Sequence, residues 1–403
     1  MTKQRIFTNL FVLFAFLLLV ATELGTASAL TLEEQLGRSI FFDTNLSVNE
    51  NQSCAACHGP AVGWTGPQSN INAGGAVYEG SILGRFGNRK PPSAAYATFS
   101  PILHYEIEKK EALFIGGNFW DGRATGEKLG NPAADQAQGP FLNPLEQALP
   151  DSAAVVSKIC TSSYADLFVQ ICGADACDSG NVDAAYNCVG LSVAAYEASA
   201  EVNAFTSRYD RSFKGVAKLT GEEHKGFALF QGKGGCKNCH LSNGQQALFT
   251  DFTYDNLGVP RNPENPFYTE ISFNPLGIDW IDLGLGGFLS SRTDYSDFAA
   301  ENYGKQKVPT LRNVDKRPSP DFVKAYGHNG YFKSLKGIVH FYNTRDVLAE
   351  CPDDYTEAQA LAANCWPKPE VPQNVNRDEL GNLGLTDQEE DAIVAFLRTL
   401  SDG

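Results

Sequence analysis

The sequence predicts a mainly α-helical chain that folds into two similarly built domains with long irregular loops. Apolar residues recur at helical spacing in several segments, whereas strand-like alternation is weak throughout. A Cys-x-x-Cys-His motif occurs twice, near the start of each half of the 403-residue chain. In each half a helical segment precedes the motif and a long polar loop follows it, so the plan is repeated. We therefore expect one domain over residues 30–215 and another over 216–403.

The two motifs predict covalent haem. They comprise Cys54, Cys57 and His58, and Cys236, Cys239 and His240. In haem c proteins two such cysteines form thioethers with the haem vinyl groups, and the adjacent histidine binds the iron. One Cys-x-x-Cys could be a zinc or redox site. Two copies, each followed by His, in a chain with ten Cys and six His favour two haem c groups in two cytochrome c-like domains.

The start of the chain has the form of a secretory signal peptide, residues 1–29. It has two early positive charges, an apolar run over residues 11–21 and an Ala-Ser-Ala cleavage site at residues 27–29. The run is too short for a membrane span, although an uncleaved anchor is the alternative. Haem c is attached outside the bacterial cytoplasm, so we expect a periplasmic mature chain that begins near Leu30. No later stretch is long and apolar enough to cross a bilayer.

The charge balance excludes one class of partner. Formal net charge is −15, which becomes −16 when Lys3, Arg5 and Glu23, together +1, leave with the signal peptide. Nucleic acid is a polyanion, so we expect no nucleic-acid partner for this acidic chain.

Six cysteines lie outside the two motifs: Cys160, Cys172, Cys177, Cys188, Cys351 and Cys365. In an oxidising compartment an even remainder predicts disulfides. The first four lie close enough in sequence to pair among themselves, which leaves three connectivities open, and the last two would close a third loop. A redox-active pair is the alternative.

Helical periodicity predicts helices over residues 31–41, 153–169, 182–205, 221–230, 335–342 and 386–400. Thr31 is a candidate cap for the first, and Thr386 with Glu389 forms a capping box at the last. Residues 59–101 and 241–302 are rich in Gly, Pro and Asn and are expected to be loops. Long loops of this kind would wrap the haem pockets.

The scarcity of methionine limits how the irons can be ligated. Met commonly completes His/Met ligation in cytochromes c, but the only methionine is Met1, which leaves with the signal peptide. Neither haem can therefore have His/Met ligation. His, Tyr, Lys, water or an open position remain for the sixth ligand.

Four further segments, with both haem motifs, resemble the bacterial dihaem cytochrome c peroxidase and MauG family. They are Phe119-Trp120-Asp121-Gly122-Arg123, Gln138-Gly139-Pro140, Val308-Pro309-Thr310-Leu311-Arg312-Asn313 and His328-Asn329-Gly330. The similarity spans nearly all of the mature chain, in the family's order. It implies a dihaem peroxidase in which His58 holds the haem that reacts with peroxide. His240 would hold an electron-transfer or charge-sharing haem.

The resemblance also implies the second ligand of the His240 haem. In the peroxidase branch a Met follows the His-Asp/Asn-Gly motif by 14 residues, and in this chain the same spacing from His328 gives Tyr342. The MauG branch has a Tyr there. A phenolate ligand would stabilise oxidised iron. The alternatives are that Tyr342 is a core residue and that His340 or His328 binds the iron.

On the His58 side, the resemblance implies an open iron. In the peroxidase branch a distal His blocks this haem, and its position falls near residues 80–82, where this chain has no His. Between His58 and Trp120 the only His is His104, outside that place. We expect an open site, with His104 as the alternative ligand.

The family's distal Gln, Pro and Glu fall on Gln136, Pro140 and Glu146, after an insertion that follows Arg123. Glu146 would be the acid/base for bound peroxide, since a carboxyl in an apolar pocket holds its proton more tightly. Gln136 would hydrogen-bond water or peroxide, and Pro140 would shape the pocket. Trp120 would carry electrons or a hole between the haems, and Arg123 would pair with a propionate. Alternatively, Glu146 and Gln136 are solvated loop residues and Trp120 is a core residue.

The family also carries a calcium ion between its domains. The Asn88 side chain and the backbone carbonyls of Val323 and Ala325 occupy the candidate positions, although the local sequence departs from the family pattern.

Three functions remain. The first is a MauG-like enzyme that uses hydrogen peroxide, through a high-valent dihaem state, to oxidise a partner protein. The second is a cytochrome c peroxidase that takes electrons from a small cytochrome or cupredoxin. The third is a non-catalytic electron-transfer protein. The missing methionine and the missing blocking histidine favour the first.

Overall fold

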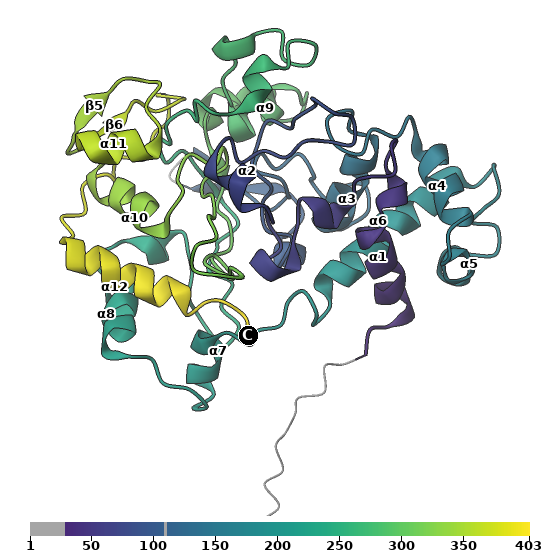
Figure 1. The fold of residues 1–403 in the computed structure, drawn as a ribbon, viewed down its shortest axis with the longest axis horizontal. Helices are drawn as coiled ribbons and strands as arrows, with labels where there is room; N and C mark the ends of the chain where they lie inside the picture. The colour runs from purple at the N-terminus through teal and green to yellow at the C-terminus, as the bar shows by residue number, and fades with distance from the viewer. Residues whose placement is uncertain (1–28, 109–110) are drawn as a thin grey trace, which may run out of the picture.

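The computed structural model describes residues 29–108 and 111–403, and Figure 1 shows its largely helical architecture. The predicted signal peptide, apart from its last residue, lies outside the described residues. The helices are α1 (Leu32–Phe42), α2 (Ser69–Ala73), α3 (Pro132–Leu142), α4 (Ser152–Cys160), α5 (Ala165–Cys172), α6 (Val182–Ala198), α7 (Arg208–Phe213), α8 (Gly221–Gln231), α9 (Gly284–Ser290), α10 (Leu335–Thr344), α11 (Glu357–Ala363) and α12 (Asp387–Arg398). Within these residues no helix has the length and apolarity that a membrane span needs.

Strands are short, as the weak alternation predicts. Three two-stranded sheets occur in the described chain, and two are antiparallel while the β5–β6 pair is parallel. The strands are β1 (His104–Glu108), β2 (Glu111–Ile115), β3 (Tyr254–Asp255), β4 (Gln306–Lys307), β5 (Ala349–Cys351) and β6 (Cys365–Pro367). The predicted loops 59–101 and 241–302 are largely irregular and include the short helices α2 and α9.

One helix pair organises the first half of the molecule. Helix α1 begins at the Thr31 cap, which forms a capping box with Glu34, and it packs across α6. At the crossing, a Cβ on Gly37 would lie 1.8 Å from the Ser192 carbonyl oxygen and 2.9 Å from the Tyr196 Cβ. Only glycine allows the two backbones to approach this closely.

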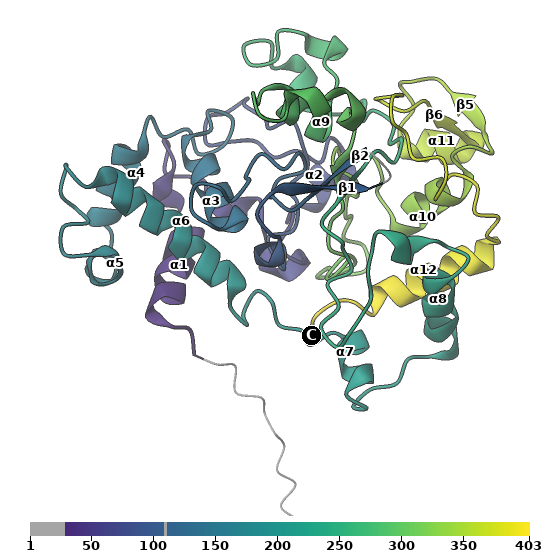
Figure 2. The same ribbon diagram turned by 180° about the vertical axis from the view of Figure 1, so that it is seen from behind.

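The second half repeats this crossing with different residues. Helix α8 packs across α12, which begins with the predicted Thr386 capping box. A Cβ on Gly226 would lie 1.8 Å from the Ala392 carbonyl oxygen and 2.9 Å from the Phe396 Cβ. Ala392 and Phe396 thus correspond to Ser192 and Tyr196 of the first half. Figures 1 and 2 show the two helix pairs on opposite sides of the molecule, with loops between them.

Each helix pair has its own hydrophobic core. The first core runs in sequence from Leu36 to Val202, and the second from Tyr209 to Leu400. Tyr209 of α7 packs edge-on against Phe249 and Phe396 of the second core. The boundary at 215/216 stays a prediction, and the observed packing places α7 with the second half.

A buried ion pair lies where the two halves meet. The Arg312 guanidinium donates two 2.9 Å hydrogen bonds to Asp210, and the two side chains are 0% and 1% exposed. The guanidinium also lies over the rings of Phe205 and Tyr96, at 4.3 and 5.1 Å from their centroids. A buried charge without its partner is strongly destabilising, so Asp210 holds the guanidinium in place within the second half. The contacts of that guanidinium with Tyr96 and Phe205 then join it to the first half.

The disulfide prediction is confirmed, and the structure selects one of the three connectivities. The pairs are Cys160–Cys177, Cys172–Cys188 and Cys351–Cys365. The first two tie α4, α5 and α6 together around the loop between α5 and α6.

Two predicted helices are wrong in extent. The segment 153–169 is two helices, because the chain turns at residues 161–164, where the Ser162 hydroxyl donates to the Ile159 carbonyl. The segment 182–205 ends as a helix at Ala198, because Ser199 adopts extended backbone. The other predicted helices are confirmed to within two residues at each end.

The glycine contact yields a stability prediction. Gly226→Ala should lower the free energy of unfolding by about 1–3 kcal/mol, because the added methyl forces α8 away from α12. Gly221→Ala, at the exposed start of the same helix with no atom within 4 Å, should cause no such loss. Urea unfolding followed by circular dichroism compares the two. Equal midpoints for both variants would show that the crossing is not closely packed.

Candidate active site

Both Cys-x-x-Cys-His motifs fold into the same tight turn. Cys54–Ala56 and Cys236–Asn238 each form one turn of 3-10 helix. In each, the carbonyl oxygen of the first cysteine accepts a 2.9 Å hydrogen bond from the amide of the motif histidine, His58 or His240. The turn places two thiols and one imidazole on the wall of a single cavity.

The two histidines are held in the form that binds iron. The Nδ1 atom of His58 lies 3.2 Å from the Trp64 carbonyl oxygen, and that of His240 lies 2.8 Å from the Phe249 carbonyl oxygen. Donation from Nδ1 leaves Nε2 as the free lone pair. Burial lowers the pKa of His58 to about 4 and also lowers the pKa of His240. Both rings are therefore neutral near neutral pH.

The four motif thiols are outside any disulfide. Burial raises the pKa of Cys54 and of Cys236 to about 12, and raises those of Cys57 and Cys239 as well. Zinc and redox Cys-x-x-Cys sites use thiolates, which this burial disfavours. Thioether attachment leaves no charged sulfur to bury, so these residues fit covalent haem c.

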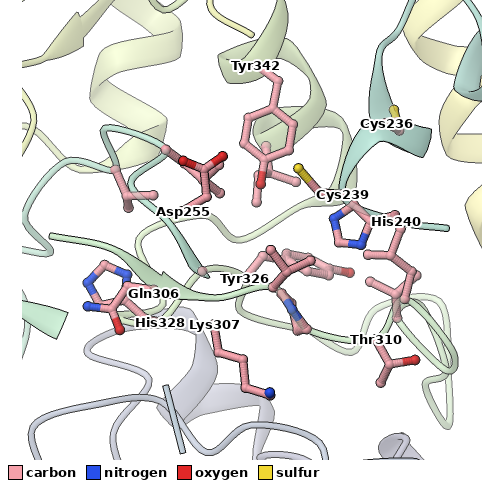
Figure 3. Close-up of a pocket in the computed structure, with 18 of the residues that line it drawn as sticks. Cys236, Cys239, His240, Asp255, Gln306, Lys307, Thr310, Tyr326, His328 and Tyr342 are labelled. Carbon is pink, nitrogen blue, oxygen red and sulfur yellow. The ribbon is translucent and has the colours of Figure 1, made fainter. Parts of the chain in front are cut away.

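The His240 cavity has mainly apolar walls (Figure 3). Helix α10 presents one face to it at positions i, i+3, i+4 and i+7, and α12 adds two residues one turn apart. These wall residues are Leu335, Ile338, Val339, Tyr342, Ile393 and Leu397.

Tyr342 is the polar group that α10 brings to this cavity. Figure 3 shows its hydroxyl pointing into the space that the His240 ring also faces. Burial raises the pKa of Tyr342 above its ordinary value, so the phenol stays neutral unless a cation lies beside it. Tyr342 and His240 thus line one cavity, and the role of Tyr342 as an iron ligand stays a prediction.

The two alternative iron ligands, His340 and His328, lie in less suitable positions than Tyr342. His340 also lies on α10, but its Nδ1 is 2.9 Å from Glu390 Oε1, and His340 is not part of the cavity wall. His328 lines the cavity beside Gln306, on the side away from His240 (Figure 3). Its ring lies edge-on to Trp120 at 6.5 Å between centroids.

The His58 side consists of two adjoining cavities. Both are lined by His58, Phe119, Trp120, Gln136 and Glu197. One of them also contains Pro140, Glu146 and Arg123. The structure therefore brings the predicted peroxide residues together with the predicted iron ligand, although their roles stay predictions.

Helix α3 explains how two of the predicted peroxide residues, Gln136 and Pro140, are placed. Asn131 caps the helix by accepting from the amides of Ala133 and Ala134. Gln136 and Pro140 are four residues apart and face the cavity. Gln138 faces the other way, and its Nε2 donates to the Tyr186 carbonyl on α6 at 2.8 Å. The Gln138-Gly139-Pro140 motif thus joins α3 to α6 as well as forming the pocket.

Glu146 follows α3 in a turn and is not a solvated loop residue. It lines the cavity, and burial raises the pKa of its carboxyl despite the nearby Arg123. The carboxyl can thus accept and return a proton nearer neutral pH than an exposed glutamate can. The acid/base role of Glu146 stays a prediction.

Trp120 separates the two haem cavities and lines all three volumes. Its Nε1–H donates to the Lys90 carbonyl at 2.8 Å, and its own carbonyl accepts from the Lys307 amide at 2.8 Å. The indole is 8% exposed. It is therefore fixed between the sites that the two haems would occupy.

Two other predicted residues have partners of their own. Arg123 donates to both oxygens of Asp121, at 3.0 and 2.9 Å, and its guanidinium lies 3.6 Å from the Phe119 ring centroid. It lines the His58 cavity, and its pairing with a propionate stays a prediction. His104 lies exposed on β1, with Nδ1 2.8 Å from the Ile102 carbonyl oxygen, and is part of no cavity described here.

The candidate calcium residues are not brought together by any described cavity. Asn88 lines the His58 cavity, and its carbonyl accepts from Asn265 at 3.0 Å. Ala325 lines the His240 cavity instead, and the Val323 carbonyl accepts from the Asn72 amide at 3.0 Å. The calcium site stays a prediction.

Sequence reasoning missed three buried charged groups at these cavities. Glu197 lines both volumes around His58, and burial raises its pKa to about 8. Burial lowers the pKa of Lys90 to about 8 and that of Lys307 to about 7. None belongs to the recognised segments. A charged residue on the apolar face of helix 182–205 is the signal that could have identified Glu197.

Comparison with known proteins agrees with this geometry. Residues 32–218 match the family described as "Di-haem cytochrome c peroxidase". The chain is 36% identical over 373 residues to methylamine utilization protein MauG of Paracoccus denitrificans (strain Pd 1222), covering 91% of this chain and 88% of MauG. The chain belongs to the di-haem cytochrome c peroxidase family. It is also 27% identical over 383 residues to cytochrome-c peroxidase IdrP2 of Pseudomonas sp. (strain SCT), covering 91% and 80% of the two chains.

Among solved structures, the diheme peroxidase BthA from Burkholderia thailandensis E264 superposes with a TM-score of 0.71 at 30% identity. The match covers 92% of this chain and 86% of BthA. Membership of the di-haem family implies two haem c groups and an oxidoreductase of the peroxidase type.

Glu146 yields a pH prediction. As a base for peroxide the carboxyl must start ionised, so the reaction should slow as pH falls through its raised pKa. Glu146→Gln should slow the reaction about 10²- to 10⁴-fold and remove this acid limb. Pro140→Ala changes the same wall without a titrating group and should keep the limb. Stopped-flow measurement of the reaction with peroxide, from about pH 5 to about pH 8, gives the pH dependence of the rate for each variant. An unchanged limb in Glu146→Gln would exclude Glu146 as the base.

Proposed function

We propose that this protein is a MauG-like di-haem enzyme that uses hydrogen peroxide to oxidise a partner protein. The observation that carries the proposal is Tyr342, whose hydroxyl points into the His240 cavity where a methionine ligand would otherwise be expected. The only methionine is Met1, so no methionine is available to bind the iron of a mature chain. The haems would supply the redox chemistry, and the side chains around them would determine how it is used.

The His58 cavity supports the peroxide half of the proposal. Glu146 takes a proton from peroxide and returns it to the oxygen that leaves, and Gln136 orients the peroxide by hydrogen bonding. Both line this cavity with His58. Among the described residues, no histidine other than His58 lines either volume on this side, which supports an open sixth position for a haem held by His58.

The Tyr342 and Trp120 positions support charge sharing. An anionic phenolate stabilises oxidised iron, which favours holding oxidising charge over storing an electron. The Trp120 indole lies between the two cavities, and an aromatic ring there can pass an electron or hole from one to the other.

The proposal also includes a redox partner protein and the cellular compartment. Oxidising equivalents would leave through a redox partner protein, and the signal peptide predicted over residues 1–29 would place the mature chain in the periplasm. A calcium ion at Asn88, Val323 and Ala325 would complete the cofactor set. The relative MauG supports the partner-oxidising function at 36% identity.

A second function has support from the relative named cytochrome-c peroxidase IdrP2. In that case electrons from a small cytochrome or cupredoxin would reduce peroxide, and Trp120 would serve the same transfer.

The response of the protein to hydrogen peroxide distinguishes these functions. When one equivalent of hydrogen peroxide is added to the protein with both irons ferric, the MauG-like function predicts an immediate change in the absorption of both haems. A change only after prior one-electron reduction would indicate the peroxidase. No change in either state would indicate a protein that only transfers electrons.

The ligand assignment has its own test. Tyr342→Phe should remove the low-spin signature of one ferric haem and raise its reduction potential, because the phenolate is lost. Tyr326 lines the same cavity, but its hydroxyl lies 3.1 Å from both Asp315 and Arg317, so Tyr326→Phe should leave that signature intact. If the spectra of Tyr342→Phe and the parent protein are the same, Tyr342 is not the ligand.

A further inference from the structure

Helix α6 places a carboxyl group inside the His58 cavity that the proposed function does not use. Glu197 is 5% exposed and lines both adjoining volumes around His58. Among the described residues none donates a hydrogen bond to its carboxyl oxygens, and burial alone accounts for the raised pKa of this group. A buried carboxyl without hydrogen bonds is costly when ionised, so its presence calls for an explanation.

The second half of the chain shows that helix packing does not require a carboxyl group at the position of Glu197. The two glycine crossings align α6 with α12, so Ser192 corresponds to Ala392 and Glu197 corresponds to Leu397. Leu397 lines the His240 cavity just as Glu197 lines the His58 cavity. The same packing position therefore holds an apolar residue beside one haem site and an ionisable residue beside the other.

The charge of the nearby haem would control the proton on this carboxyl. A ferric haem carries one positive charge on its iron-porphyrin core, and a ferrous haem carries none. Without a haem beside it, burial raises the pKa of Glu197 to about 8. A nearby positive charge favours the ionised carboxylate and lowers that pKa. Reduction of the haem therefore raises the proton affinity of the carboxyl.

Other charged groups face the same cavities. They are Glu146, Arg123, Arg89 and Lys90 around one volume and Lys307 around the other, while the neutral but titratable His58 ring lines both. Three residues after α6 ends, Glu201 pairs with Arg38 of α1 and accepts from the Tyr196 hydroxyl. Glu146 is the other buried carboxyl here, so an experiment has to separate the two.

We propose that Glu197 is a redox-linked proton site for the haem in the His58 cavity. Its carboxylate takes one proton from solvent when one electron reaches that haem, and it releases the proton when the electron leaves. The electron comes from the redox partner protein, and only the carboxyl O–H bond forms or breaks. This inference needs a haem at His58, which family membership implies, and does not depend on which peroxide function is correct.

The reduction potential of the His58 haem tests this, measured against pH by spectroelectrochemistry on the haem-loaded protein. In the parent protein the potential should fall with rising pH, toward one proton per electron in the range where Glu197 titrates. In the Glu197→Gln variant the side chain at this position is neutral at every pH. Its potential should match the parent at low pH, where the parent carboxyl is protonated, and should rise progressively above it as pH increases.

Two variants control the experiment. Glu197→Leu, which copies the residue of the second half, should behave as Glu197→Gln does. Glu201→Gln removes a half-exposed carboxylate near the end of the same helix and should keep the parent slope. A constant offset between Glu197→Gln and the parent at all pH values would show a structural effect and overturn the proposal. It would also fail if the slope survived in Glu197→Gln and disappeared in Glu146→Gln.

Discussion

The position of the Trp120 indole is the constraint on which the relation between the two sites depends. The indole Nε1–H donates to the Lys90 carbonyl, and the Trp120 carbonyl accepts from the Lys307 amide. Two other segments of the chain therefore hold Trp120 in place. The ring cannot move without leaving a buried N–H unpaired, which costs about 1–3 kcal/mol. Because Trp120 lines every cavity described here, the proposed transfer of charge between the two sites would pass through a ring that is held in one position.

Around that ring, a duplicated scaffold carries unequal chemistry. Both halves use a helix crossing that requires glycine, a Cys-x-x-Cys-His turn and a histidine bonded to a backbone carbonyl. Among the side chains that differ between them are Glu146 and Glu197, which line the His58 cavity, and Tyr342, which lines the His240 cavity beside carboxylates of its own such as Asp255. Carboxyls can move protons beside an open iron, whereas a phenol can close the other iron as a ligand. The proposed function rests on this asymmetry.

Much of this was predictable from sequence because it depends on local signals. The capping boxes at Thr31 and Thr386, the haem motifs and the helical placement of Tyr342 all lie within a few residues of their cause. The predicted register of Gln136, Pro140 and Glu146 agrees with one cavity, although an insertion precedes them. Long-range packing was not predictable. The charge of Glu197 on an apolar helix face is a sequence signal, but nothing near it in sequence shows that it lines the same cavity as His58. The Val323 carbonyl accepts from the Asn72 side-chain amide, which sequence reasoning did not consider.

The central claim is that the two irons differ at rest, one open and one closed by Tyr342. Electron paramagnetic resonance of the untreated protein, with both irons ferric, tests this most directly. The account predicts two distinct signals of equal intensity, one from a haem with an open or weakly held sixth position and one from a low-spin haem with a strong second ligand. Two equivalent signals, or two low-spin haems of the bis-histidine type, would contradict it.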